Sequence, residues 1–281
     1  MNAFDNMLAR YKAATKEEKN NALREVMQQV VLAGLARSDF FEKAAFYGGT
    51  CLRLLYDLPR FSEDMDFSLL KVDENFDLQN YFPYIKDEFL SMGKSIELYK
   101  KEKRQKTNME SAFLKSTSQF YDVKFQTEKQ VKIKIEIDTV PPLDFETENK
   151  LLLQPFSFNV RCFTLPCLFA GKMHAFLFRN WKARVKGRDW FDFEWYVQNQ
   201  VSLSLKHFIA RAAQFGDQSM KIKNEKLFKQ ALTKRIKSVD VKSVLSDVLP
   251  FLKNPKNTEI WSTDYFLELV RKMECCPENG R

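Results

Sequence analysis

Histidine and cysteine are scarce in this chain, so sites that depend on them are poorly supported. Only two histidines, His174 and His207, occur in 281 residues. A histidine-rich metal site or a Ser-His-Asp triad therefore has few candidate members. The five cysteines are an odd number in a chain of this length, which argues against a disulfide framework of the kind that small secreted domains use.

Long apolar runs are missing as well. A membrane-spanning helix needs about 20 consecutive apolar residues, and the best candidate, around 30–35, is far too short. The N-terminus carries Asp5, Arg10 and Lys12 where a signal peptide would have its apolar segment. We therefore expect a cytoplasmic protein that has no membrane partner. Its 44% hydrophobic and 14% aromatic residues suffice for a folded core.

Basic residues are concentrated in one region of the chain. The net charge is +8, and residues 171–237 hold fifteen Lys or Arg against five Asp or Glu, so the rest is slightly acidic. Such a local excess of positive charge is typical of proteins that bind a polyanion such as a nucleic acid. A solvated helical surface is the alternative, because basic helices are also frequent on ordinary proteins.

Hydrophobic periodicity predicts an α+β fold, with a mixed sheet flanked by helices and a helical C-terminal region. Thr15 and Glu18 form a capping-box pattern at the start of a helix at 16–37. Up to residue 138 the spacing then predicts a strand at 44–47, a helix at 50–56, a strand at 64–70, a helix at 77–92 and strands at 95–100, 111–116, 119–125 and 130–138.

From about residue 164 onward the spacing is helical throughout. The predicted helices span 165–181, 190–198, 203–215, 222–236, 241–249 and 261–273. Pro141 and Pro142 are expected to close the sheet region. We accordingly predict one domain at 1–150, with an N-terminal helical arm and the core sheet, and a helical domain at 151–281.

Two carboxylates lie two residues apart on the strand predicted at 64–70. Side chains two apart on a strand point to the same face, so Asp64 and Asp66 can hold one pair of divalent cations. Carboxylates suit magnesium, and two ions roughly 4 Å apart stabilise the attacking and leaving oxygens in nucleotidyl transfer. The alternative is a polar edge strand after a turn.

A pair of glycines precedes these carboxylates. Gly48 and Gly49 lack Cβ atoms, so backbone amides there can approach a triphosphate closely. A helix that starts near Thr50 would direct the positive end of its dipole at the same phosphates. A Gly-Gly pair alone is usually a turn, and the combination with the two carboxylates is the more specific signal.

A third carboxylate is available on the strand predicted at 130–138. Apolar and polar residues alternate strictly there, which places Lys134, Glu136 and Asp138 on one face. If this strand neighbours the Asp64 strand, Glu136 or Asp138 completes the metal site and helps to activate the attacking hydroxyl. Lys134 could contact phosphate. The alternative is an amphipathic strand with a solvated face.

Charged residues recur at helical spacing further along. Lys172 shares a helix face with Arg179, seven residues later, and the chain continues to Arg188, Asp189 and Asp192. Spacing alone leaves the roles of the last three open, because Asp189 can be a helix cap and Asp192 can pair locally with Arg188.

Taken together, the chain resembles the AbiEii/AbiGii-type toxin family of nucleotidyltransferases, a branch of the DNA polymerase β-like superfamily. Four stretches carry the likeness: Phe46-Tyr47-Gly48-Gly49-Thr50-x-Leu52-Arg53 with Arg60-Phe61-Ser62-x-Asp64-Met65-Asp66-Phe67, then Lys134-x-Glu136, then Lys172-x-His174-Ala175 with Arg179, and finally Arg188-Asp189-x-x-Asp192. The likeness spans about 44–198 and implies a nucleotidyltransferase-type sheet core.

The resemblance also implies residue roles. Asp64 and Asp66 would bind magnesium, Lys172 would bind nucleotide phosphate, and Asp192 would be an essential acidic residue. Gly48, Gly49 and Ser62 would shape the nucleotide pocket. Some members of the family are toxins of two-gene systems that transfer nucleotides to the 3′ end of tRNA, so an RNA acceptor and a cognate antitoxin are implied.

We therefore predict a magnesium-dependent nucleotidyltransferase that moves a nucleoside monophosphate from a nucleoside triphosphate to an RNA end. Two alternative functions remain open at this point. One is a binding module that keeps the fold without turnover, which the carboxylate pair argues against because such a pair beside a polyanion needs metal ions to neutralise it. The other is a small-molecule nucleotidyltransferase, which shares the metal site and differs in its acceptor.

Overall fold

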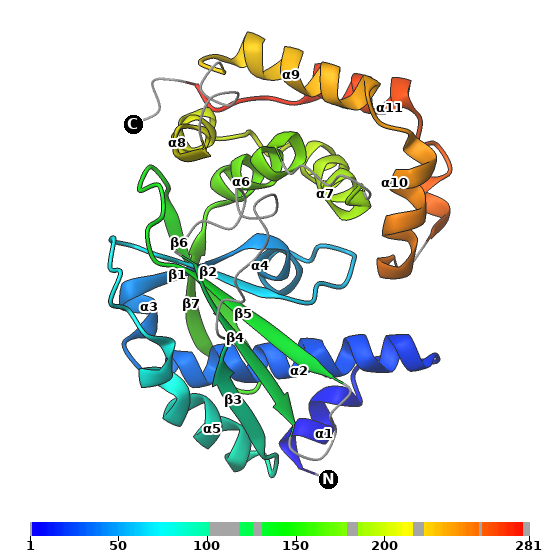
Figure 1. The fold of residues 1–281 in the computed structure, drawn as a ribbon. Helices are drawn as coiled ribbons and strands as arrows, with labels where there is room; N and C mark the ends of the chain where they lie inside the picture. Colours follow the sequence, from blue (N-terminus) through cyan, green and yellow to red (C-terminus); the bar gives the residue numbers. More distant parts are fainter. Residues whose placement is uncertain are drawn as a thin grey trace. The chain divides into compact units, whose positions relative to one another are not determined.

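The structure is a computed structural model that describes residues 2–101, 118–125, 131–178, 185–215, 222–252 and 255–277. Within these ranges the chain forms two compact units (Figure 1). Unit 1 comprises Met1–Asp57, Phe61–Pro141 and Thr147–Phe163, and unit 2 comprises Leu58–Arg60, Pro142–Glu146 and Thr164–Arg281. The domain boundary expected at residue 150 stays a prediction.

Unit 1 is built on a seven-stranded mixed sheet with the order β3-β4-β5-β2-β1-β7-β6. Its strands are β1 (Ala44–Tyr47), β2 (Met65–Leu69), β3 (Ile96–Lys100), β4 (Ser118–Phe125), β5 (Lys132–Asp138), β6 (Thr147–Leu152) and β7 (Phe158–Phe163). The β2-β5 and β1-β7 pairs are parallel, and the other neighbours are antiparallel. The predicted α+β class is confirmed, and the strand predicted at 111–116 lies outside the described residues.

The helices of unit 1 are α1 (Ala3–Leu8), α2 (Lys16–Ala36), α3 (Phe40–Lys43), α4 (Gly48–Leu55) and α5 (Phe82–Ser91), with a 3-10 turn η1 (Leu78–Tyr81). The capping box of Thr15 and Glu18 is present at the start of α2, as predicted. The single helix expected at 77–92 is instead η1 followed by α5, because Pro83 sits in the first turn of α5 and cannot donate a backbone hydrogen bond.

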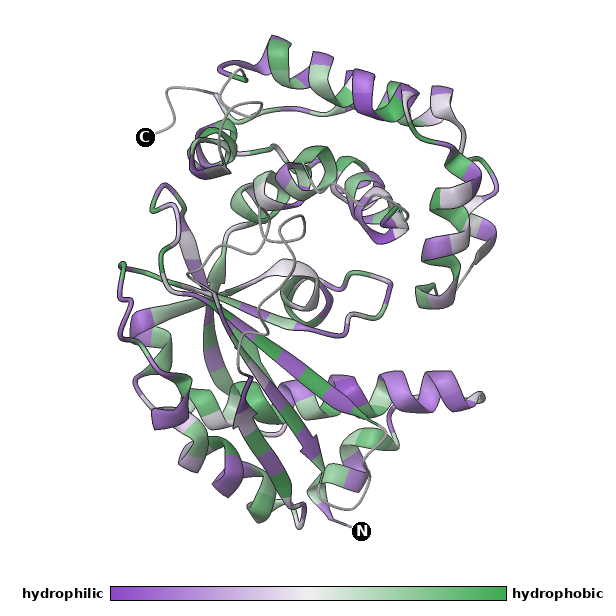
Figure 2. Ribbon diagram, viewed as in Figure 1, coloured by the Kyte–Doolittle hydropathy of each residue, from purple (hydrophilic) through white to green (hydrophobic). Residues whose placement is uncertain are grey.

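The core of unit 1 lies on one face of the sheet. Phe67 of β2 and Tyr121 of β4 are fully buried there. Phe40 of α3 meets Phe67 with ring centroids 5.1 Å apart, and Phe82 of α5 meets Tyr121 at 5.9 Å. Figure 2 shows the resulting alternation of hydrophobic and hydrophilic residues along the strands. The opposite face therefore keeps its polar residues, including those predicted for the site.

Two strands follow the prolines that were expected to end the sheet. Phe158, Val160 and Cys162 of β7 are buried alternately, so this strand carries a period-two signal that the helical interpretation missed. No residue of β6 is fully buried, because β6 is an edge strand. Pro141 and Pro142 thus lie in the connection between β5 and β6.

Unit 2 is helical, as predicted, with α6 (Leu165–Phe178), α7 (Gly187–Gln198), α8 (Leu205–Phe215), α9 (Glu225–Lys237), α10 (Val241–Val248), α11 (Thr263–Lys272) and the 3-10 turns η3 (Leu249–Phe251) and η4 (Pro255–Thr258). Aromatic side chains fill its core. Phe169 stacks on Tyr196 at 4.3 Å, and Trp190 meets Phe266 edge-on at 4.7 Å. No helix in the described ranges is long and apolar enough to cross a membrane.

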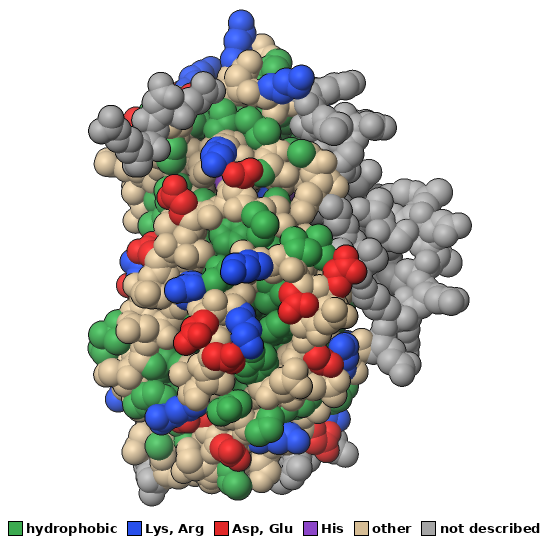
Figure 3. Space-filling view, turned by 90° about the vertical axis from the view of Figure 1, so that its left-hand side faces the viewer, with side chains coloured by type: hydrophobic (Ala, Val, Ile, Leu, Met, Phe, Trp, Pro, Cys, Tyr) green, Lys and Arg blue, Asp and Glu red, His purple; other side chains and the backbone are tan. Residues whose placement is uncertain are grey.

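Acidic and basic side chains are interspersed over much of the face that Figure 3 shows.

The packing of α2 on α5 gives a test of the core. A Cβ added to Gly34 would lie 2.7 Å from Ile85 Cα, a backbone atom that cannot move without shifting α5. We expect Gly34→Ala to destabilise the protein by about 1–3 kcal/mol through overpacking. Gly171→Ala in α6 is the control, since nothing lies within 4 Å of its added Cβ. That change should be neutral or stabilising by up to about 1 kcal/mol. Urea unfolding of both variants measures the difference.

Candidate active site

The acidic pair lies at the start of β2, on the polar face of the sheet. Met65 and Phe67 are fully buried, Asp66 is half-buried and Asp64 is exposed. This alternation is the one that the sequence predicts. Asp66 therefore lies on the polar face of β2, and Asp64, the residue before the strand, continues the same alternation.

The neighbouring strand β5 supplies the third carboxylate. β2 and β5 are parallel, and Asp66 lies opposite Glu136 while Ser68 lies opposite Asp138. Residues paired in this way share a face of the sheet. Asp138 also accepts a hydrogen bond from the Val140 amide at 3.2 Å. The register thus favours Glu136 over Asp138 as the partner of Asp66.

Lys134 brings a positive charge to these acids. Its ammonium lies 3.0 Å from Glu136 Oε2 and 4.5 Å from the centroid of the Phe120 ring. Burial alone would lower the pKa of Lys134, but attraction to Glu136, and more weakly to Asp64 and Asp66, raises it above its usual value. Lys134 is therefore held in its charged form beside the acids.

The Gly-Gly turn approaches Asp66 from the adjacent strand. β1 ends at Tyr47, and α4 begins at Gly48, whose φ of +83° favours glycine. A Cβ on Gly48 would lie 3.1 Å from Asp66 Cγ and closer still to Oδ2. The missing Cβ is thus what lets the start of α4 lie against this carboxylate.

The other two residues of the turn differ in exposure. Gly49 is partly exposed at the first turn of α4. Thr50 is fully buried, and its hydroxyl donates to the Asp64 carbonyl. The Thr50 side chain therefore fixes the backbone that carries the acidic pair.

Two residues that the sequence motifs do not include fix the surrounding backbone. Gln28 of α2 is fully buried, and its amide donates to the carbonyls of Ser62 and Glu63 at 3.0 and 3.1 Å. Glu25 of α2 forms a bidentate pair with Arg53 of α4 at 2.7 and 3.0 Å. Gln28 lies three residues before Val31, on the apolar face of the helix predicted at 16–37. A polar side chain on that face was the sequence signal for a buried hydrogen bond there.

Lys172, which is expected to bind phosphate, lies in a compact ionic group of unit 2 that we call the Lys172 cluster. It consists of Lys172 in α6, Asp189 and Asp192 in α7, and Arg60. Lys172 Nζ lies 2.9 Å from Asp189 and 2.8 Å from Asp192. Arg60 donates from two nitrogens to the two oxygens of Asp192, both at 2.6 Å. The sequence placed Arg60 in a motif but predicted no role for it, because its partner lies 132 positions away.

The Lys172 cluster is closed to solvent at its centre. The side chain of Asp192 has no exposed surface, Arg60 is 2% exposed and Lys172 is 14% exposed. Burial would raise the pKa of Asp192, yet the charges of Arg60 and Lys172 lower it below its usual value. Asp192 is therefore a charged, fully enclosed carboxylate that holds Lys172 in place.

Two more predicted residues remain to be placed. Arg188 lies over the Phe251 ring at 4.0 Å, in a cation-π contact within unit 2. Arg179 lies outside the described residues, as does the segment up to residue 184.

No group of three His, Cys, Asp or Glu side chains in the described ranges is gathered tightly enough to hold a metal ion as it stands. The donor chemistry nevertheless fits magnesium, because Asp64, Asp66 and Glu136 are all carboxylates. To become a ligand, Glu136 would share its carboxylate between Lys134 and the metal or release Lys134, which it holds through Oε2.

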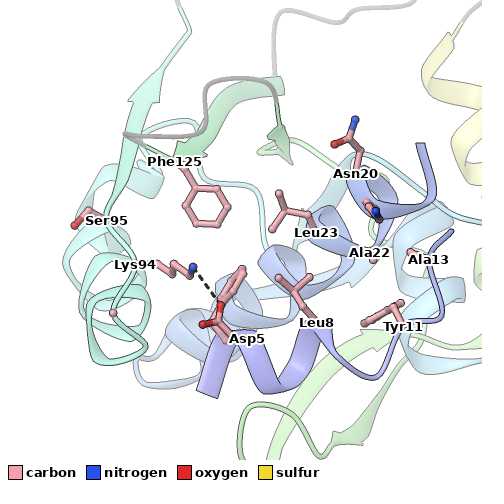
Figure 4. Close-up of a pocket in the computed structure, with 13 residues that line it drawn as sticks. Asp5, Leu8, Tyr11, Ala13, Asn20, Ala22, Leu23, Lys94, Ser95 and Phe125 are labelled. Atoms are coloured by element: carbon pink, nitrogen blue, oxygen red, sulfur yellow. Dashed lines mark ion pairs between the residues drawn. The ribbon is translucent and has the colours of Figure 1, made fainter. Parts of the chain in front are cut away.

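A cavity of about 750 Å³ lies elsewhere in unit 1 (Figure 4). Leu8 of α1, Leu23 of α2 and Phe125 of β4 line it, and the Asp5–Lys94 ion pair at 3.3 Å lies at its side. None of the predicted site residues borders this cavity. Its lining therefore gives no support to a nucleotide site there.

Comparison with known families decides whether the chain is an enzyme or a binding module without turnover. Residues 30–269 match the family model described as "Nucleotidyl transferase AbiEii toxin, Type IV TA system". The chain belongs to this family. It is thus a nucleotidyltransferase, and the binding module without turnover is set aside. Membership in a toxin-antitoxin family implies a nucleoside triphosphate substrate and a cognate antitoxin. The comparison with curated protein sequences finds no match.

Solved structures share the fold. JHP933 from Helicobacter pylori is 18% identical, with 92% of this chain and 90% of that chain covered and a TM-score of 0.51. MenT4, a nucleotidyltransferase toxin from Mycobacterium tuberculosis, is 17% identical, with 95% and 87% covered and a TM-score of 0.51. At this level of identity the likeness supports the nucleotidyltransferase fold of this chain. It assigns neither a substrate nor an acceptor.

The Lys172 cluster predicts a large loss of stability when its central acid is neutralised. Asp192→Asn removes the buried carboxylate that Arg60 and Lys172 share, and Lys172 keeps only its pair with Asp189. We expect a loss of about 3–5 kcal/mol in the free energy of unfolding, measured in urea. Glu268→Gln is the control, because it removes an exposed partner of Arg271 and should change little. Equal stability of the two variants would contradict the structural role of Asp192.

Proposed function

We propose that this AbiEii protein transfers a nucleoside monophosphate from a nucleoside triphosphate to the 3′ end of an RNA in a magnesium-dependent reaction. The observation that carries the proposal is the parallel pairing of β2 with β5, which sets Asp66 beside Glu136 on the polar face of the sheet. Gly48 brings the start of a helix to the same carboxylate. The carboxylates of Asp66 and Glu136 and the N-terminal end of α4, which can bind phosphate, would then lie at the same site.

Asp64, Asp66 and Glu136 would hold the magnesium, as a two-ion site. When bound, the metal neutralises charge that develops on the attacking and leaving oxygens. The hydroxyl oxygen of the RNA end attacks the α-phosphorus, the bond to the β-phosphate breaks, and pyrophosphate leaves. Glu136 accepts the hydroxyl proton, since it lies beside Asp66 in the register.

Lys134 changes partner in this proposal. Without nucleotide it pairs with Glu136 at 3.0 Å. A triphosphate offers the ammonium a stronger negative charge, so its binding frees Glu136 for metal and proton transfer. Gly49 and the amides at the start of α4 receive phosphate oxygens, and Ser62 lies on the loop that Gln28 fixes.

Lys172 binds the triphosphate in this proposal, and Asp192 acts as a positioning residue. Asp192 is fully enclosed, so it acts on the substrate through Lys172 and not by direct contact. The cations Lys172 and Arg60 balance the acids Asp189 and Asp192, so a triphosphate would have to compete with these acids for the Lys172 ammonium. Arg179 and Arg188 remain candidates for further phosphate contacts.

The acceptor is proposed to be RNA because the excess of basic residues in 171–237 suits a polyanion. A tRNA 3′ end is the specific candidate, and a cognate antitoxin would restrain the reaction. The nucleoside triphosphate and the RNA both occur in the cytoplasm, where we propose that the protein acts. A small-molecule acceptor is the competing outcome of the assay below.

The proposal is tested by incubating the protein with magnesium, each labelled nucleoside triphosphate in turn, and total RNA. We expect label in RNA, with transfer lowered at least 100-fold in Asp66→Asn because the metal site loses a ligand. Glu136→Gln should fall similarly, and Asp138→Asn should retain most activity. Transfer that persists unchanged in Asp66→Asn would refute the site. Label found only in small molecules would refute the RNA acceptor.

The Gly48 turn gives an independent test. Gly48 and Gly93 both have positive φ, at +83° and +71°, so alanine strains the backbone similarly at each. Only at Gly48 does the new Cβ crowd Asp66, whereas at Gly93 the nearest atom is Asn2 Nδ2 at 3.6 Å. We expect a loss of thermal stability in both variants, larger in Gly48→Ala because its Cβ also meets Asp66, but loss of nucleotide transfer in Gly48→Ala alone. Equal activity in both variants would count against a role of Gly48 at the site.

A further inference from the structure

Unit 2 carries a basic groove, outside the four stretches that carry the likeness to the family. It lies between α9 and α11, has a volume of about 620 Å³ and is hereafter called the α9 groove. Five of its eight lining residues are cationic, and none is acidic: the cations are Lys226, Lys229, Lys234, Lys237 and Arg271. The groove is therefore a concave surface of one charge sign.

The four lysines follow one face of α9. They occur at spacings that place them on one side of a helix, while Phe228, Leu232 and Ile236 on the opposite side are fully buried. From Lys226 to Lys237 the row is about 16 Å long at 1.5 Å per residue. That length lets the row follow several phosphates of a nucleic-acid backbone.

Three of these charges have no counter-ion within the described residues. Lys229 pairs with Glu225 at 2.8 Å and Arg271 with Glu268 at 2.7 Å. No ion pair there includes Lys226, Lys234 or Lys237, and all three side chains are exposed. Lys and Arg side chains stand at the upper end of the face in Figure 3, the end at which Figure 1 draws α9.

Helix stability does not explain the row. Lysines in the last turn of α9 favour the helix dipole, but Lys226 lies in the first turn, where a positive charge is unfavourable. Lys226 and Lys229 also repel one another at i, i+3, as do Lys234 and Lys237. A polyanion bound along the groove relieves both penalties.

We propose that the α9 groove binds the phosphodiester backbone of the RNA acceptor. This inference rests on the proposed function for the identity of the polyanion. No aromatic side chain lines the groove, so it offers no stacking platform for bases. Gln230 adds a neutral donor. Binding there is consequently independent of RNA sequence, sensitive to salt, and serves to orient the RNA.

The test compares two triple variants with the same change in net charge. Lys226→Gln, Lys234→Gln and Lys237→Gln are combined in the groove variant. The control combines Lys16→Gln, Lys71→Gln and Lys86→Gln, three exposed lysines of unit 1. The probe is a fluorescently labelled RNA hairpin with a single-stranded 3′ tail, and its anisotropy is measured with EDTA over a range of salt concentrations.

We expect the groove variant to bind the hairpin about tenfold more weakly at physiological salt, with the slope of log K against log salt reduced by about 2 to 3. The control variant should bind like the wild type. Replacing the same three groove lysines by arginine should preserve affinity, and equal unfolding temperatures show that all variants fold. Equal affinity of the groove and control variants overturns the proposal and leaves an acidic protein as the competing occupant.

Transfer of label to the same hairpin separates this inference from the proposed function. If the wild type labels the RNA while the groove variant binds and labels it equally well, the groove proposal fails and the function stands. If no protein labels RNA but the groove variant alone loses affinity, the groove is an RNA surface and the proposed reaction is wrong.

Discussion

The parallel pairing of β2 with β5 is the constraint on which the candidate site depends. It sets Asp66 directly beside Glu136, and like charges that face each other across a strand pair repel. The apolar face of the same pair holds the register in place, because Met65 and Ile135 are fully buried. A slip of one residue would bury the acids and expose these side chains. Core packing thus maintains an electrostatically unfavourable arrangement, and Lys134 offsets part of its cost.

The backbone around the acids is fixed by residues that lie away from the chemistry. Thr50 holds the Asp64 carbonyl, and Gln28 holds the loop before it through two carbonyls. Glu25 ties α4 to α2 through Arg53. Such contacts bring the acidic side chains into position through main-chain atoms. They also explain why α2, which carries no motif residue, belongs to the functional part of unit 1.

The local parts of this architecture could be predicted from the sequence, and the long-range pairings could not. The capping box of α2 and the alternation along β5 are encoded within a few residues of one another. By contrast, the neighbourhood of β2 and β5 and the pairing of Arg60 with Asp192 join segments far apart in the chain. Periodicity within a segment carries no information about its partner. The site residues themselves stay a prediction until the variants are measured.

The basic composition of 171–237 conceals two opposite uses of lysine. Lys172 is nearly enclosed and neutralised by two aspartates, so it contributes little to the charge that solvent meets. Lys226, Lys234 and Lys237 are exposed and have no counter-ion among the described residues. An enclosed and positioned cation suits a compact ligand held in one geometry, such as a triphosphate. A row of exposed cations suits a long polyanion that is bound through its backbone. One segment thus combines an enclosed cation in its first third with a row of exposed cations in its last, a difference that its summed charge alone does not reveal.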